Sequence, residues 1–147
     1  MRPISIRRFE LFYLLAVALG ILNGILSWNT TMAAMEQQSP EAAAIMPAAT
    51  AVGLAIGLGI SLLLWFFVAR RASNVARWIL IVLYALGLLS FLYTLSMGTM
   101  AGGGVSMALM LLSYVLEAIA IYMTFRPDAD AWLKGQGPAE EQARPFE

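Results

Sequence analysis

The sequence predicts an all-α integral membrane protein, an antiparallel four-helix bundle with both termini in the cytoplasm. Three observations predict this class. Apolar residues make up 61% of the 147 positions and charged residues only 12%, against about 45–50% and 25% in soluble domains. The apolar residues are concentrated in four runs of roughly 20 residues, the length that crosses a bilayer as a helix. Lys and Arg are confined to the N-terminus, the middle loop and the C-terminus.

The four predicted spans cover residues 9–28, 46–69, 77–97 and 103–125. Helices follow because lipid offers no hydrogen bonds, so each spanning segment must satisfy its own backbone. The loop between the first two spans and the loop between the last two contain no Lys or Arg. Since basic residues stay on the cytoplasmic side, we expect both termini and the middle loop inside and the other two loops outside.

The first span follows three arginines, a pattern that also occurs in secretory signals, with Thr31-Met32-Ala33 as a candidate cleavage site. Its apolar run is longer than the 7–15 residues of a signal core, so we expect it to be retained. Gly20 and Gly24 are four residues apart with Asn23 beside them, and such small residues let helix backbones approach in lipid. We interpret them as an intramolecular packing face; the alternative is a homodimer face.

The second span is preceded by Ser39-Pro40-Glu41, which is typical of a helix start. We therefore expect this helix to begin outside the membrane and Pro47 to kink it near the outer interface. Small residues then repeat at every fourth position, at Ala49, Gly53, Gly57 and Ser61. This face is predicted to pack against another helix, either of this chain or of a partner.

The middle loop is bordered by Arg70, Arg71 and Arg77. We interpret these arginines as orientation signals; binding of anionic lipid head groups is the alternative. Ser73 or Asn74 is expected to cap the third helix. That helix is predicted to end near Gly98 in a left-handed glycine conformation, and residues 102–104, all glycine, are predicted to form a flexible turn.

The C-terminal region is predicted to hold a short interfacial helix at residues 127–134, with Trp132 and Leu133 at the inner membrane surface. Residues 1–134 would thus form one bundle. The polar residues 135–147 are predicted to be a disordered cytoplasmic tail.

Glu117 is the acid that lies well inside the fourth span. A carboxylate at that depth is costly unless it faces protein and is neutral or paired. Counted from the inner ends of the helices, Ser61 and Tyr84 lie at its level, and no Lys or Arg does. Its own face carries small and polar residues that should point into the bundle: Ser106, Ser113, Ala120 and Thr124.

We therefore expect Glu117 to be neutral and to donate a hydrogen bond to Tyr84 or Ser61. One interpretation of this buried polar site is that the carboxyl fixes the helix register. The alternative is a proton or cation site.

Cysteine and histidine are both absent. Thiol and imidazole chemistry and the common zinc ligands are therefore excluded, and we expect no catalytic residues, no metal and no cofactor. The expected partners are the lipid bilayer and other membrane proteins or a second copy, bound through the small-residue faces, and not nucleic acid.

Residues 71–80, RASNVARWIL, residues 82–87, VLYALG, and FRPD at residues 125–128 with Ala131-Trp132 resemble uncharacterised small bacterial inner-membrane proteins with four spans. The resemblance extends over about half of the chain. It implies a bacterial inner (plasma) membrane location and brings no assigned activity.

From these features we expect a non-enzymatic integral membrane protein that acts through helix packing as an accessory or assembly subunit of a larger membrane complex. The alternative is a small homo-oligomeric transporter or channel that uses Glu117 as a proton or cation site.

Overall fold

The computed structural model describes residues 2–38, 41, 44–98 and 103–135. The described residues form six helices and no strand: α1 (Ile4–Leu26), α2 (Trp28–Gln38), α3 (Met46–Arg71), α4 (Asn74–Ser96), α5 (Gly103–Met123) and α6 (Pro127–Leu133). Four of them, α1, α3, α4 and α5, are long and apolar enough to cross a membrane. The predicted all-α architecture with four spans is confirmed.

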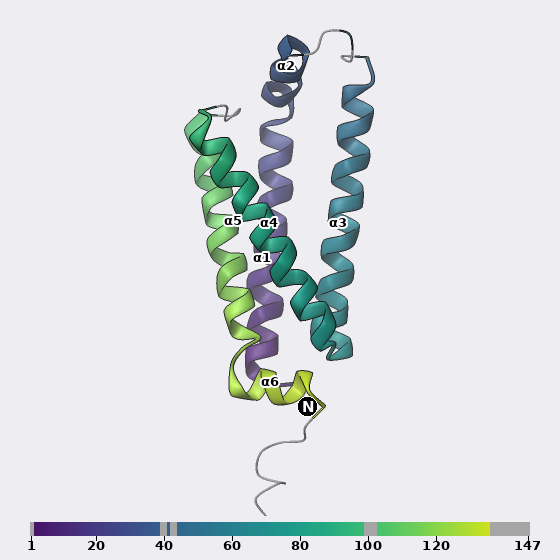
Figure 1. Cartoon of the computed structure of the whole chain (residues 1–147), viewed down its shortest axis with the longest axis vertical. Helices are drawn as coiled ribbons and strands as arrows, with labels where there is room; N and C mark the ends of the chain where they lie inside the picture. Colours follow the sequence, from purple (N-terminus) through teal and green to yellow (C-terminus); the bar gives the residue numbers. More distant parts are fainter. Residues whose placement is uncertain (1, 39–40, 42–43, 99–102, 136–147) are drawn as a thin grey trace, which may run out of the picture.

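The four long helices run alternately up and down the bundle (Figure 1). α1 and α4 start at the end where α6 lies, which we call the α6 end, and α3 and α5 finish there. α2 lies at the opposite end, called here the α2 end. α1 and α5 make by far the most extensive helix contact, whereas α4 crosses the bundle obliquely (Figure 1). Every Lys and Arg that the structure describes lies at or beside the α6 end.

The hydrophobic core is concentrated in the half of the bundle next to α6. Phe9 stacks on Tyr13 with their ring centroids 5.4 Å apart, and the buried apolar residues around them come from five helices: Ile6, Leu64, Val68, Ala69, Ala76, Leu80, Ala120, Ile121, Ala129 and Leu133. In α3 the burial stops at Leu64, and the side chains of residues 51–57 are exposed. The bundle is therefore tight at the α6 end and open toward the α2 end.

The segment between the first two spans differs from the prediction. α2 follows α1 after the single turn residue Ser27, whose hydroxyl donates to the Asn23 carbonyl over 2.6 Å, and no sequence signal predicted this helix. α3 begins only at Met46; Ser39 and Pro40 lie outside the described residues. Pro47 consequently lies in the first turn, where a helix needs no amide donor, so the predicted kink is wrong.

The other helix ends follow their local sequence. Ala72 adopts a left-handed conformation, with φ 49°, and Ser73 caps α4 by accepting from the Ala76 amide over 3.2 Å. Gly98 closes α4 at φ 64°, as predicted. The predicted glycine turn lies partly outside the described residues, with α5 beginning at Gly103. The predicted disordered tail lies outside them except for Gly135.

α6 occupies the predicted position, but its apolar side faces the bundle. Ala129 and Leu133 are buried, and Trp132 packs against the core. α6 thus lies across the start of α1 (Figure 1), and core contacts hold it in addition to any contact with the membrane surface.

Candidate functional site

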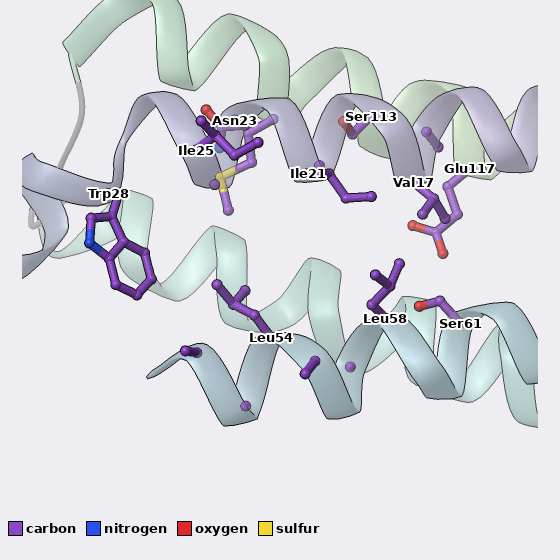
Figure 2. A pocket seen from close by; sticks show the side chains of 18 of the residues that line it. Val17, Ile21, Asn23, Ile25, Trp28, Leu54, Leu58, Ser61, Ser113 and Glu117 are labelled. Atoms are coloured by element: carbon purple, nitrogen blue, oxygen red, sulfur yellow. The ribbon is translucent and has the colours of Figure 1, made fainter. Parts of the chain in front are cut away.

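A groove of about 900 Å³ runs between α1 and α3, with α5 contributing its floor. We call it the central groove; it is lined by residues between 16 and 25 of α1, by Trp28 and Asn29 at the start of α2, by residues between 51 and 61 of α3, and by four residues of α5: Met110, Ser113, Tyr114 and Glu117. Figure 2 shows Val17 and Ile21 of α1 facing Leu54 and Leu58 of α3 across it. Trp28 lies near one end of the groove and Glu117 near the other (Figure 2).

The glycines of the two predicted packing faces line this groove. A Cβ atom placed on Gly20, Gly24, Gly53 or Gly57 would meet no atom of the described chain within 4 Å outside its own helix turn. The predicted intramolecular packing face of Gly20 and Gly24 is therefore wrong. The reason is that α3 touches the bundle through Leu64, Val68 and Ala69 near the α6 end, which leaves the two glycine faces opposite each other and apart.

The remaining members of these faces have different surroundings. Ala49 is exposed on α3, beyond the residues that line the groove. Asn23 lines the groove, and its Oδ1 accepts a hydrogen bond from the Ser106 hydroxyl over 2.7 Å. This bond joins α1 to α5 at the level where the groove opens. Asn23 therefore bonds across the α1–α5 contact, the most extensive helix contact in the described part of the chain.

Glu117, Ser61 and Tyr84 come together as the sequence predicted. All three line a smaller cavity of about 210 Å³ that adjoins the central groove, together with Tyr13 and Tyr114. The side chains of Glu117 and Ser61 point toward one another from opposite walls (Figure 2). On α5, Ser106 and Ala120 are buried and Ser113 is half-buried, and Thr124, directly after the helix, is buried as well, so the small and polar face of Glu117 does point into the bundle.

The expected hydrogen bond from Glu117 to Tyr84 or Ser61 is wrong. The Tyr84 hydroxyl donates to the Tyr114 carbonyl over 3.3 Å, and the Ser61 carbonyl accepts from the Tyr13 hydroxyl over 3.2 Å. The Tyr114 hydroxyl donates to the Gly87 carbonyl over 2.9 Å. Among the described residues the carboxyl group of Glu117 has no hydrogen-bond or ion-pair partner. Tyrosine hydroxyls that already donate to carbonyls can offer Glu117 only an acceptor oxygen.

Two residues of this level, Tyr13 and Tyr114, were not predicted. Tyr114 is three residues before Glu117 on one helix, a spacing that places side chains side by side, so it could have been found from the sequence. Tyr13 gives no such signal, because its position depends on how α1 meets α3. Within the described part of the chain no three His, Cys, Asp or Glu side chains gather as a metal site would require.

A second polar cluster closes the α6 end, formed by Ser5, Arg77, Asp128, Asp130 and Lys134; we call it the α6 clamp. The Arg77 residue is 3% exposed, and its Nη1 donates to the Asp130 carboxylate over 2.8 Å and to the Thr124 carbonyl over 3.1 Å. The Lys134 ammonium lies 2.6 Å from the same carboxylate. Arg77 is thus enclosed by protein, and the alternative interpretation, binding of lipid head groups, is wrong for this residue.

Arg70 and Arg71 remain exposed, in agreement with a position at the membrane surface. The Arg70 guanidinium lies 3.1 Å from the Glu10 carboxylate, which also pairs with Arg2 over 3.1 Å. The pair with Arg70 joins α1 to the end of α3, and the pair with Arg2 lies within the N-terminal segment. Exposed ion pairs of this kind contribute little free energy, about 0–1 kcal/mol each.

Asp128 caps α1 from α6. Its carboxylate accepts from the Ser5 amide over 3.1 Å and from the Ser5 hydroxyl over 2.7 Å, so it satisfies an amide that the first turn of a helix leaves free. Desolvation alone would raise the pKa of Asp128, but the hydrogen bonds from Ser5 hold it below the ordinary value. Hydrogen bonds from Lys134 and Arg77 likewise lower the pKa of Asp130.

These pKa directions predict a loss of stability in acid. Both carboxyls have a folded-state pKa below the ordinary value of 3.8, so their ionised forms stabilise the fold above that pH and the contribution is lost as pH falls through the folded pKa. We expect the unfolding temperature in detergent to change little from about pH 7 to about pH 5 and to fall below about pH 4. A variant with Asp128→Asn and Asp130→Asn should show a smaller acid-induced fall than the wild type; an equal fall would contradict the assignment.

The comparisons with family models, with curated proteins and with solved structures each found no match for this chain.

Proposed function

We propose that this protein is a non-enzymatic subunit of a larger membrane complex and that its central groove receives a transmembrane helix of another membrane protein. The observation that supports this most is the pair of glycine faces on α1 and α3, which the described chain leaves uncovered. Burial in lipid gives helices no hydrophobic reason to associate, so close approach over small residues is a main source of helix affinity. Here two helices present such faces to the same space.

The dimensions of the groove suit a helix. Its α3 wall runs from Ala51 to Ser61, ten residues apart, or about 15 Å at 1.5 Å per residue. A volume of about 900 Å³ over that length corresponds to a mean cross-section of about 60 Å², and a helix of 10–12 Å diameter has roughly 80–110 Å². The groove therefore accommodates more than half of the cross-section of a helix and leaves the rest outside.

We place the α6 end in the cytoplasm and the protein in a bacterial inner membrane. The orientation is supported by the Lys and Arg residues that the structure describes, which lie at or beside that end, since positive charges are retained on the cytoplasmic side. The bacterial location is supported by the resemblance of residues 71–80 and 82–87 to four-span inner-membrane proteins.

The proposal predicts where a partner cross-links. A photoreactive amino acid at Leu58, in the groove wall, should form an adduct with a polypeptide in native membranes. The same amino acid at Leu89, which is exposed on α4 away from the groove, should react with lipid. The polypeptide should also remain bound when the protein is extracted gently and its native mass is measured. Lipid adducts at both positions would count against a helix in the groove.

A second candidate function is a small homo-oligomeric transporter or channel. It is favoured by the cavity of about 210 Å³ in which Glu117 lies among three tyrosines without a partner in the described chain. This candidate requires the extracted protein to be a pure homo-oligomer. It also requires Glu117→Gln to abolish a proton or cation flux in reconstituted vesicles, a flux that a packing subunit lacks.

A further inference from the structure

We infer that the helix received by the central groove carries a Lys or Arg side chain that pairs with Glu117, and that this helix therefore belongs to a different protein. The inference rests on the proposed function of the groove and adds the chemistry and identity class of the partner. Glu117 lines both the groove and the adjoining cavity, so a helix lying in the groove passes directly by its carboxyl group.

Among the described residues that line the cavity with Glu117 there is no basic donor, and the Ser61 hydroxyl is an uncharged one. Each of the three tyrosine hydroxyls in the cavity donates to a backbone carbonyl, and in the described chain nothing donates to the carboxyl group. Acidic side chains within membranes are normally paired with a basic side chain or with backbone groups. The unmet requirement of the carboxylate at this level is therefore a positively charged donor.

The aromatic side chains at this level also favour a cation. Tyr84 and Tyr114 line the cavity next to Glu117, with their rings edge to face and their centroids 6.1 Å apart. An ammonium or guanidinium group that reaches Glu117 lies near these rings, and ring faces attract cations when water is excluded. The glycines in the groove walls allow the backbone of the incoming helix to come close enough for its side chain to reach.

A second copy of this chain cannot supply that cation. Residues 9–69 and 78–125 contain no Lys or Arg, and the arginines that flank them lie in the terminal turns at the α6 end. Glu117 is six residues from the end of α5 at Met123, about 9 Å into the bundle. In a parallel copy the arginines remain at the α6 end, where long basic side chains extend toward the interface, and in an inverted copy they lie still farther away. Charge complementarity with Glu117 thus requires a helix from a different protein.

The test uses synthetic transmembrane helices and the whole protein in lipid nanodiscs. Three helices share one Leu/Ala sequence with a Gly face and differ at one residue: Lys at the depth of Glu117, Leu at that position, or Lys moved two turns toward the α2 end. Association is measured by energy transfer between labelled helix and protein. We expect the first helix to bind at least tenfold more tightly than the other two, and we expect Glu117→Gln to remove this preference while the Leu helix binds as before.

The outcomes separate the inference from the proposed function. Equal binding of the first helix and the Leu helix would overturn the inference and leave the groove as a helix site. A preference for Lys that persists in Glu117→Gln would also overturn it, because the cation would then be bound elsewhere. Failure of all three helices to bind would overturn the proposed function and the inference together. The comparison of the three helices on the wild-type protein tests the inference even if Glu117→Gln is unstable.

Discussion

Gly57→Leu combined with Gly24→Leu is expected to abolish helix binding by the central groove without unfolding the protein. A Cβ at either position meets no atom of the described chain within 4 Å outside its own helix turn, so the free protein can accommodate the leucines. Each leucine then occupies space that the incoming helix needs, and overpacking of this kind costs about 1–3 kcal/mol per site. For the pair we expect at least a hundredfold loss of affinity, about 2.7 kcal/mol.

The neutral Leu helix described above, with energy transfer in nanodiscs, measures this loss. Ala118→Leu is the matched control, because Ala118 is exposed on α5 and lines neither the groove nor the smaller cavity; it should bind the helix like the wild type. Gly87→Leu, in contrast to the Gly24/Gly57 double variant, should destabilise the free protein. A Cβ there lies 3.6 Å from the Tyr114 hydroxyl oxygen, and the larger side chain disturbs the fold. Unchanged binding by the Gly24/Gly57 double variant would show that the groove does not receive a helix.

The spans were predictable because length and apolar composition decide them without reference to neighbours. The packing was not, and the glycines show why. Their spacing indicates that a helix can approach, but the same spacing serves a helix of this chain and one of a partner. The outcome depends on the angle at which α3 leaves the bundle, which is set by Leu64, Val68 and Ala69 near the α6 end.

For the polar residues, too, the depth in the membrane was predictable and the bonding partners were not. The depth of Glu117 in the membrane could be counted along its helix, and its proximity to Ser61 and Tyr84 followed from their equal depths. The lack of a hydrogen bond to Glu117 could not be predicted. The tyrosine hydroxyls at that level donate to backbone carbonyls instead, and the positions of those carbonyls depend on how the helices pack. For Arg77 the charge indicated a terminal position correctly, but the sequence did not reveal that α6 folds back and encloses the guanidinium.

Arg77→Met is expected to destabilise the bundle by about 2–3 kcal/mol. Methionine keeps much of the apolar stem and removes the guanidinium. The Thr124 carbonyl and the Asp130 carboxylate each lose a charged donor, and hydrogen bonds to charged groups contribute about 1.5–3 kcal/mol each. The loss stays below the 3–5 kcal/mol typical of a fully buried pair, because Asp130 is 30% exposed and keeps Lys134.

Thermal unfolding in one detergent measures this cost, with Arg71→Met as the control. Arg71 is exposed, and its described contact is a stacking interaction with Phe66 at 5.9 Å, so its replacement should change stability by no more than about 0.5 kcal/mol. A double variant with Asp130→Asn should lose less stability than the sum of the two single variants, as expected for residues in direct contact. If Arg77→Met and Arg71→Met unfold alike, the Arg77 contacts do not hold α6 to the bundle, and the hydrogen bonds between Ser5 and Asp128 and the core contacts of Ala129 and Leu133 hold it instead.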